Sequence, residues 1–372
     1  MDKILLEDCC EILDSMRVPI TSSDRVEGPY PYYGANGIQD HVSDYIFDDE
    51  LVLLAEDGGN FGSKERPIAY RVSGKCWVNN HAHVLKPKEG IDVDYLCYSL
   101  MFYNVGGMVN GATRQKLTQA AMRQMLIPKR TMEEQKHIVE LLAKVVAVRE
   151  KRLQELDELD NLIKARFVEM FGDVAAEDYK YETKKLSDVA EVGSSHRVFT
   201  TEFVEEGIPF YRGTEIGELA NGQKPSDPYY ISVEHYNRLT NDETKPKVGD
   251  LLMPSICNKG QVWMVDTDEP FYYKDGRVLC ISADRGIYNP KYLQYFMKVK
   301  TEIEYPKMGS GSTFAEFKIF LLKNFDILTP PISVQDEFTE FVKQVDKSRF
   351  AIQKSLEKTQ LLFDSLMQKY FG

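Results

Sequence analysis

Residues 133–172, EEQKHIVELLAKVVAVREKRLQELDELDNLIKARFVEMFG, decide the fold of this chain. The stretch contains no proline, and its only glycine is the last residue, so nothing interrupts a helix. Alternate steps of four and three residues place one seam along such a helix, made of Ile138, Leu142, Val145, Arg149, Arg152, Leu156, Leu159, Ile163, Arg166 and Met170. A helix of this length spans roughly 60 Å, more than one compact domain needs.

A second copy of the pattern follows 200 residues later (338 − 138 = 200), with the seam Phe338, Val342, Val345, Arg349, Ile352, Leu356, Thr359, Phe363, Leu366 and Tyr370. The residue itself repeats at Gln135/Gln335, Glu140/Glu340, Phe171/Phe371 and Gly172/Gly372. Each copy has the spacing of a capping box at its start, Thr131 with Glu134 and Ser333 with Asp336. Each ends in a glycine that can adopt the left-handed backbone. Two copies of one helix indicate a duplicated protein.

The composition favours a protein with real hydrophobic cores. A length of 372 residues predicts two or three domains, and a hydrophobic content of 43% is enough to build them. No run of 18 apolar residues and no signal-like N-terminus occur, so we expect a cytoplasmic protein without a membrane partner. The six cysteines contain no CxxC, which predicts free thiols and no structural metal. The net charge of −12 argues against a uniformly basic surface but allows a local basic stripe.

The region before the first long helix predicts short strands and helices connected by polar loops. Residues 51–55 form a buried strand, 68–72 and 76–78 a hairpin around a turn at 73–75, and 94–103 a helix. Glycine-rich polar loops are expected at 32–37, 56–62 and 110–116. Loops of this kind are where binding residues usually lie.

The region 186–331 repeats this plan in diverged form. Arg17-Val18 corresponds to Arg197-Val198 (197 − 17 = 180), Tyr95-Leu96 to Tyr292-Leu293, and 111–113 to 311–313. The offset grows from 180 to 200, so the second copy carries about 20 extra residues, expected around 221–247. The loops of the copies differ in nearly every side chain. A shared scaffold with unlike loops predicts modules that do one kind of job on different targets.

Several segments carry a resemblance to a known family: YYGANGI at 32–38, WVNNHAHVL at 77–85, LIP at 126–128 before EQKHIV at 134–139, and TPPISVQD at 329–336. Together with the repeat order, which spans essentially the whole chain, they resemble the DNA-specificity subunit of a type I restriction-modification enzyme. Each motif alone is weak, whereas the full order is specific.

The resemblance implies mixed α/β target-recognition domains in two copies, separated by long antiparallel coiled-coil helices. The expected parts are recognition domain 1 at 1–130, the central helix at 131–173, recognition domain 2 at 174–331, and the C-terminal helix at 332–372. Each domain would read half of a split site in double-stranded DNA, and the helices would fix the spacer between the halves. The helices would also dock two methyltransferase subunits, which bind S-adenosylmethionine. Translocase-nuclease subunits complete such an enzyme, and this chain would hold no catalytic residue, cofactor or metal.

Base readout needs Arg or Lys for guanine and Asn or Gln for adenine, with further polar groups on phosphates. In the first domain the candidates are Arg17, Tyr33, Asn36, Gln39, Asn60, Lys64, Arg66, Asn79, Asn80, Thr113, Arg114 and Lys116. In the second they are Arg197, Tyr211, Arg212, Asn258, Lys259, Gln261, Arg277, Ser310, Ser312, Thr313 and Lys318. The alternative for each is a solvated loop residue or a turn former. For Arg17 and Arg197, which occupy the same place in both copies, the alternative is an internal salt bridge.

Other polar residues have competing interpretations. His81 and His83 would point the same way on a strand, as metal ligands could, but no third ligand is adjacent, which favours core or DNA-facing roles. The seam residues Arg149, Arg152, Arg166 and Arg349 either extend to solvent or pair with carboxylates such as Glu155, Asp157 and Asp160 and fix the helix register.

An enzyme would need a catalytic motif. The chain shows no Asn-Pro-Pro-aromatic motif, no phosphate-binding loop and no HExxH, which argues against catalysis. The alternative from another class is a coiled-coil scaffold with two protein-binding domains, which the net charge of −12 favours.

Overall fold

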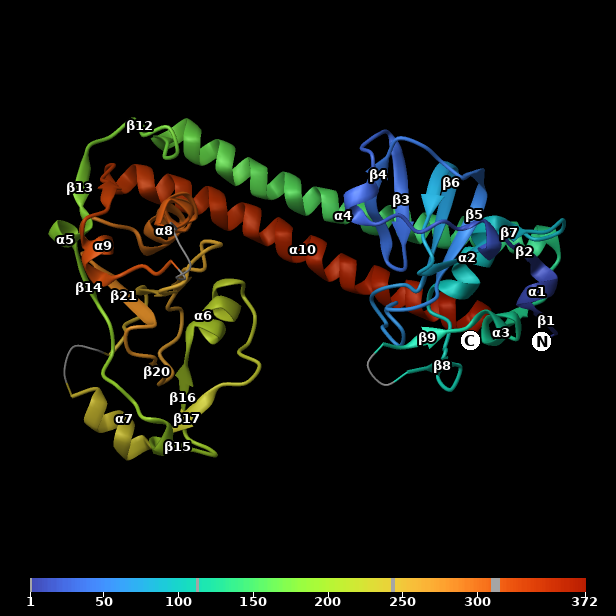
Figure 1. Cartoon of the computed structure of the whole chain (residues 1–372). Coiled ribbons are helices and arrows are strands. Elements are labelled where there is room, and N and C mark those ends of the chain that lie inside the picture. Colours follow the sequence, from blue (N-terminus) through green and yellow to red (C-terminus); the bar gives the residue numbers. More distant parts are fainter. Residues whose placement is uncertain (1, 112–113, 242–244, 309–314) are drawn as a thin grey trace. The chain divides into compact units, whose positions relative to one another are not determined.

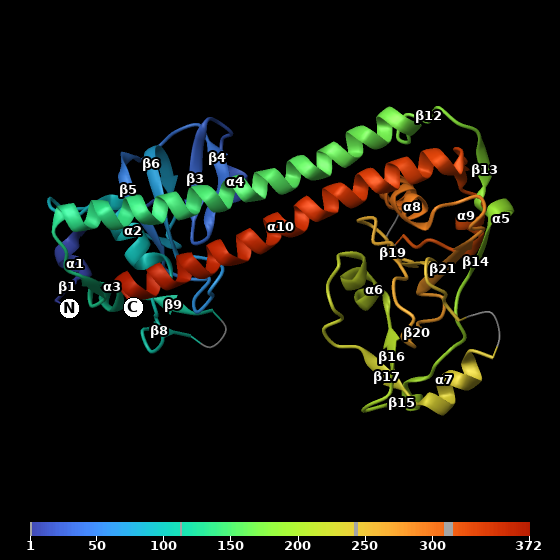
Figure 2. The same cartoon turned by 180° about the vertical axis from the view of Figure 1, so that it is seen from behind.

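The computed structural model of the chain describes residues 2–111, 114–241, 245–308 and 315–372. The elements divide into two compact units, labelled by element in Figures 1 and 2. Unit 1 comprises Met1–Gln154 and Ile352–Gly372, and unit 2 comprises Glu155–Ala351. Helices α4 (Met132–Phe171) and α10 (Ile332–Phe371) are each divided between the two units, with one part of the helix in each. The predicted mixed fold with a repeated 40-residue helix is confirmed.

The strands of unit 1 pair in the order β2-β7-β5-β6-β3-β4. Their bounds are β2 Cys10–Ile12, β3 Tyr30–Gly34, β4 Gly37–Val42, β5 Phe47–Ala55, β6 Ala69–Val78 and β7 Ala82–Pro87. Outside this sheet β1 (Lys3–Leu5) pairs with β10 (Leu126–Pro128), and β8 (Val109–Asn110) with β9 (Lys116–Leu117). The shorter helices are α1 Leu6–Cys9, α2 Val93–Met101 and α3 Gln119–Arg123. The buried strand predicted at 51–55 is confirmed within β5.

The hairpin predicted at 68–78 is wrong. Strand β6 runs straight through 73–75, and its pairing with β5 continues from Ala69 opposite Leu54 to Cys76 opposite Phe47. Gly74 has a φ of +75°, which glycine adopts inside a strand without reversing the chain. The reversal lies instead at 35–36, between β3 and β4, within a stretch predicted as a loop.

The strands of unit 2 pair in two sheets, β14-β21-β18-β19 and β15-β17-β16-β20. Their bounds are β14 Ala190–Gly193, β15 Phe203–Val204, β16 Ile208–Tyr211, β17 Tyr229–Ile231, β18 Leu251–Pro254, β19 Trp263–Met264, β20 Tyr272–Tyr273 and β21 Val278–Ala283. Strand β11 (Gly172–Asp173) pairs with β12 (Asp178–Tyr179), and β13 (Thr183–Lys185) with β22 (Asp326–Leu328). The shorter helices are α5 Leu186–Val189, α6 Gly213–Ala220, α7 Val233–Leu239, α8 Pro290–Glu304 and α9 Ile319–Lys323. Strand β17 and helix α7 lie in the stretch where the sequence places extra residues.

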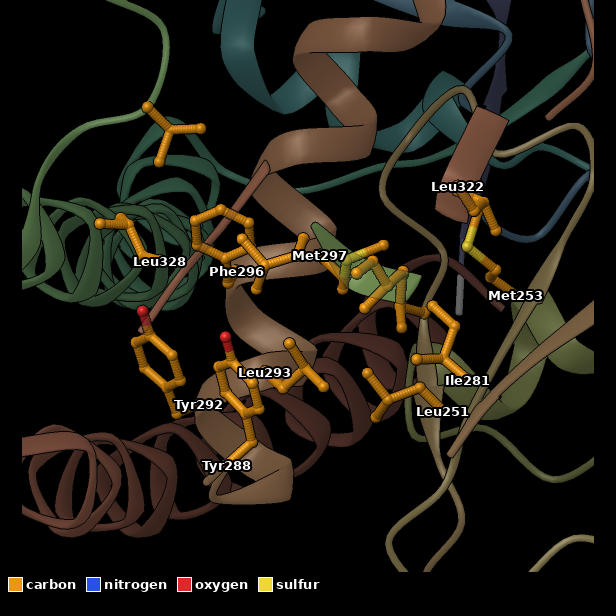
Figure 3. Packing of buried hydrophobic residues seen from close by; sticks show 14 of the residues in the cluster. Leu251, Met253, Ile281, Tyr288, Tyr292, Leu293, Phe296, Met297, Leu322 and Leu328 are labelled. Carbon is orange, nitrogen blue, oxygen red and sulfur yellow. The ribbon is translucent and has the colours of Figure 1, made fainter. Parts of the chain in front are cut away.

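Helix α8 packs on both sides in the core of unit 2. Leu293 and Met297 lie on the side of α8 near Leu251 and Ile281 of the sheet (Figure 3). On another side, the Tyr292 ring centroid lies 4.9 Å from that of Phe171 at the end of α4. The core therefore joins sheet, domain helix and long helix into one body, stabilised by apolar burial.

The long helices pack antiparallel within each unit. In unit 1, Leu142 near the start of α4 shares a core with Phe363 near the end of α10. In unit 2, Phe167 near the end of α4 packs on Phe338 near the start of α10. Here the seam moves from the predicted Arg166 and Met170 to Phe167 and Phe171, because a helix of 3.6 residues per turn drifts from a 3.5-residue repeat.

The predicted starts of the long helices have different outcomes. The capping box of α4 is confirmed, since Glu134 N–H donates to Thr131 Oγ1 (3.3 Å) and Thr131 N–H donates to Glu134 Oε2 (2.8 Å). The capping box predicted at Ser333 is wrong, because α10 already begins at Ile332 and Asp336 accepts a hydrogen bond from Asn289 instead. At the end of α4, Gly172 has the expected left-handed backbone, with φ +94°.

The cysteines are free thiols, as predicted. Among the described residues, no helix is both long enough and apolar enough to cross a membrane.

Candidate DNA interface

Arg17 lies inside a polar network of unit 1. Its Nη1 donates to Glu56 Oε2 (2.6 Å) and to the carbonyl of Ala82 (2.8 Å), and its Nε donates to the carbonyl of Asp14 (2.9 Å). Only 13% of its side chain is exposed. These contacts favour the internal salt bridge over base contact for Arg17.

His83, on β7, is fully buried beneath this network. Its Nδ1 lies 2.7 Å from Asp14 Oδ2, and its Nε2 lies 2.9 Å from the carbonyl of Leu117. Burial raises the pKa of Asp14, but hydrogen bonds from His83 and Gln119 lower it, and the net shift is downward. His81 precedes β7, so the two histidines do not form the strand pair considered from sequence.

One carboxylate oxygen each of Asp14 and Glu56 and one His83 nitrogen lie within 4.8 Å of one another, close enough to hold a metal ion. The guanidinium of Arg17 already supplies positive charge there, 2.6 Å from Glu56 and 3.6 Å from Asp14. Burial raises the pKa of Glu56, while Lys116 and Arg17 lower it, so it stays below its usual range. The cluster is therefore an ion-pair network in this structure.

Asn36, Arg114 and Lys116, three of the candidates, surround the loop that follows β5, and we call them the unit 1 rim. Lys116 Nζ lies 2.8 Å from Glu56 Oε1, and Arg114 Nη2 lies 2.8 Å from Asp57 Oδ1. The Asn36 amide donates to the carbonyl of Gly58 (3.0 Å). About half of each cationic side chain is exposed, so both retain donors that face solvent.

Other candidates of unit 1 have structural roles or lie elsewhere. Asn79 is buried, and its amide donates to Gln39 (3.0 Å) while its backbone N–H donates to the Tyr33 carbonyl (3.0 Å). Asn80 is exposed in the turn before β7. The half-buried Asn60 and the exposed Lys64 and Arg66 lie in the loop 56–68, with Lys64 beside the end of α10 rather than at the rim. Thr113 lies outside the described residues.

In unit 2, Arg197, Arg277 and Lys318 gather at the turn before β21, and we call them the unit 2 rim. Arg277 pairs with Glu316, and Lys318 Nζ lies 2.6 Å from the same carboxylate. Arg197 is 69% exposed, and its Nε lies 3.9 Å from Asp275 Oδ2 in a loose ion pair. Arg197 is thus available to a ligand, unlike its counterpart Arg17.

The remaining candidates of unit 2 are held in local structure. Arg212 binds Glu215 through its Nε (3.1 Å) and lies over the Tyr229 ring. Burial raises the pKa of Glu215, but Arg212 lowers it, with a net downward shift. Tyr211 packs on Phe271. Asn258, Lys259 and Gln261 form a hydrogen-bonded turn. Ser310, Ser312 and Thr313 lie outside the described residues.

Comparisons with known proteins give the family. The profile described as "Type I restriction modification DNA specificity domain" matches residues 1–158 and 179–361. A putative type I restriction enzyme specificity subunit of Haemophilus influenzae is 31% identical over 358 residues, which cover 94% of this chain and 89% of that relative. The chain belongs to the type I restriction-modification DNA specificity family.

Solved structures of specificity subunits share the fold. The S subunit from M. genitalium gives a TM-score of 0.56 at 14% identity, over 100% of this chain and 96% of that one. A chain from a study of complex assembly and conformational transition of the type I system gives a TM-score of 0.60 at 16% identity. The match covers 100% of this chain and 97% of that one. The predicted resemblance is confirmed.

Within this specificity subunit, the backbone shows which positions at or beside the rims correspond. His81 lies beside the unit 1 rim, where its Nδ1 is 2.6 Å from Asp57 Oδ1. Leu117 N–H donates to the Glu56 carbonyl, and Phe317 N–H to that of Ser255, each at 2.7 Å. Lys116 therefore corresponds to Glu316, preserving the offset of 200. In the same way, Glu56 N–H donates to the His81 carbonyl and Ser255 N–H to that of Arg277, each at 2.8 Å, so His81 corresponds to Arg277.

Sequence reasoning missed the carboxylates that hold the rims, Glu56, Asp57 and Glu316. Glu56 and Asp57 directly follow the buried strand 51–55, at the start of the polar loop 56–62. Their place in a loop that was expected to carry binding residues could have identified them. Glu316 could have been found by applying the offset of 200 to Lys116.

Proposed function

We propose that this specificity subunit recognises a bipartite target in double-stranded DNA, the unit 1 rim reading one half-site and the unit 2 rim the other. The supporting observation is the change of side chain at corresponding positions, Lys116 against Glu316 and His81 against Arg277. Because base edges differ in their donors and acceptors, a change of charge on one scaffold favours a different base. Recognition domains 1–130 and 174–331 are part of this proposal.

The partly paired cations of the rims suit DNA contact. Arg114, Lys116, Arg277 and Lys318 are each about half exposed and paired to a carboxylate that orients them. A fixed, half-exposed Arg or Lys can offer its remaining donors to guanine or phosphate at little cost in side-chain ordering.

We further propose that α4 and α10 dock two methyltransferase subunits, which bind S-adenosylmethionine and transfer the methyl group, and that translocase-nuclease subunits complete the enzyme. The chain itself would contribute no cofactor and no catalytic group. Large apolar side chains exposed on the long helices support docking: Val148, Leu162, Phe350 and Leu361, the last two each 69% exposed. Apolar surface of this kind is typical of protein interfaces.

The experiment is to map methylated adenines in genomic DNA of cells that carry the methyltransferase subunit with and without this chain. We expect one split motif that appears only with the chain. The same motif in both samples, or none, would contradict the proposal.

The alternative, a coiled-coil scaffold with two protein-binding domains, is favoured by the net charge of −12. The dependence of binding on salt concentration distinguishes the two functions. Binding through phosphate contacts weakens steeply with ionic strength, whereas binding to a protein through apolar surface does not.

A further inference from the structure

A cavity of about 840 Å³ lies in unit 1. One wall comes from α2 and the residues that follow it, including Tyr98, Phe102 and Tyr103. The other comes from the last turns of α10, including Phe363, Met367 and Phe371. These walls combine apolar and aromatic side chains with polar ones such as Ser99, Asn104 and Gln368, and no rim residue lines them.

The internal repeat identifies the corresponding surface in unit 2. Gln135 accepts a hydrogen bond from the N–H of Asp92, and Gln335 accepts one from the N–H of Asn289. Asp92 and Asn289 therefore correspond, and the offset between α2 and α8 is 197 (289 − 92). Tyr98, Phe102 and Tyr103 thus correspond to Tyr295, Val299 and Lys300. With the offset of 200 between the long helices, Phe363, Met367 and Phe371 correspond to Ile163, Phe167 and Phe171.

In unit 2 the chain itself covers the part of this corresponding surface that surrounds Phe171. Residues 173–181 turn back after α4, and Val174, which is 3% exposed, packs in the same core as α8 and Phe171. Tyr179 and Tyr181 pack against that core, with the Tyr181 ring 6.2 Å from the Phe171 ring. Lys180 N–H donates to the Phe171 carbonyl at 3.1 Å, which fixes the segment on the helix end.

We propose that the unit 1 cavity binds an extended segment of a partner protein that carries an aliphatic residue and two tyrosines in the order Val-x4-Tyr-x-Tyr. The segment 173–181 shows which side chains fit this surface in the repeated fold. Tyrosines suit a half-open cavity, because the ring is buried while the hydroxyl stays in water.

Charge at the cavity agrees with such a segment. Residues 173–182 carry Asp173, Glu177, Asp178 and Glu182 against one lysine. The charged side chains that line the cavity are Lys3, Lys64 and Asp364, and the two lysines can each pair with one carboxylate of such a segment. Lysine–carboxylate pairs of this kind favour a segment with acidic residues.

The test uses the full chain and a fluorescent peptide with the sequence of residues 173–182, DVAAEDYKYE, titrated by anisotropy. We expect saturable binding, at least about tenfold weaker for a peptide in which Val174, Tyr179 and Tyr181 are replaced by alanine. Met367→Asp in the cavity wall should weaken binding by a similar factor. Ser365→Asp, at an exposed position of the same helix that does not line the cavity, is the matched control and should bind normally.

A second measurement does not depend on variants folding. A photoreactive residue at the Tyr179 position of the peptide should cross-link to residues 98–104 or 363–371 of the unchanged chain. Absent binding, equal binding of the alanine peptide, or cross-links confined to unit 2 would overturn the proposal. A dimer of the chain that the peptide dissociates would assign the cavity to a second copy and also overturn it. Because no step involves DNA, these outcomes are independent of the proposed function.

Discussion

Gln135 accepts a 2.8 Å hydrogen bond from the backbone N–H of Asp92, whose own carboxylate caps helix α2. Gln335 makes the same bond at 2.9 Å to Asn289, the cap of α8. Each glutamine also donates to two carbonyls, and both are buried. In each unit a long helix is therefore tied through one side chain to the start of the domain helix.

Gln335→Ala should lower the free energy of unfolding by about 1–3 kcal/mol, because it leaves one buried N–H and two carbonyls without their partner. The change would be measured by urea denaturation. Gln344→Ala, exposed on the same helix, is the control and should change stability by less than about 0.5 kcal/mol. Equal losses of stability in the two variants would show that the buried hydrogen bonds of Gln335 do not stabilise the fold.

Arg17 and Arg197 occupy corresponding positions in the two repeats, but their substitution should have different effects on stability and on DNA binding. Arg17→Ala leaves Glu56 poorly compensated near the interior, and we expect a loss of about 2–4 kcal/mol of stability. Arg197→Ala should keep stability within about 0.5 kcal/mol and weaken DNA binding. Thermal melts and DNA titrations of both variants test this, with assembly onto methyltransferase subunits as the control. Unchanged DNA affinity of Arg197→Ala would remove it from the unit 2 rim.

Lys318→Ala should weaken DNA binding, and if the lysine contacts a phosphate, the slope of log K against log salt should fall by about 1. Lys347→Ala, exposed on the part of α10 that belongs to unit 2, is the matched control. Affinity measured from low to moderate salt gives both slopes. Parallel lines for wild type and Lys318→Ala would exclude a phosphate contact.

Acid should destabilise both units. The pKa of Asp14 lies below its ordinary value of 3.8, and that of Glu215 below 4.5. A carboxyl with a lowered pKa contributes stability above the ordinary value and loses it as the pH falls through the folded value, so melting temperatures should drop below about pH 4.5. Asp14→Asn should flatten part of this drop, whereas Asp24→Asn, in an exposed helical turn, should not. The same pH profile for both variants would contradict the assignment.

Arg349 and Asp160 test the idea that seam arginines fix the helix register. Arg349 Nη2 lies 2.5 Å from Asp160 Oδ1 across the helix pair of unit 2, as that hypothesis requires. Since both side chains are partly exposed, a double-mutant cycle to alanine should give a coupling of only about 0.3–1 kcal/mol. A coupling energy of zero would show that the ion pair of Arg349 and Asp160 does not help to fix the register of the two helices.

Much of this protein follows from local patterns in its sequence. The seam of residues 133–172, its copy 200 residues later and the glycine after α4 depend on helix periodicity and backbone conformation, which a sequence displays directly. The repeat offsets likewise predicted which segments correspond. The family resemblance rested on this order, and the comparisons confirm it.

Only the tertiary structure decided which candidates are free to bind. Arg17 and Arg197 look alike in sequence, yet one is enclosed by Glu56 and the Ala82 carbonyl while the other is exposed. Those partners lie 39 and 65 residues away, so no local pattern reveals them. Likewise, Gly74 resembles a turn until the pairing of β6 with β5 shows a continuous strand. Local patterns determine the elements, but long-range pairing determines which polar groups are already satisfied.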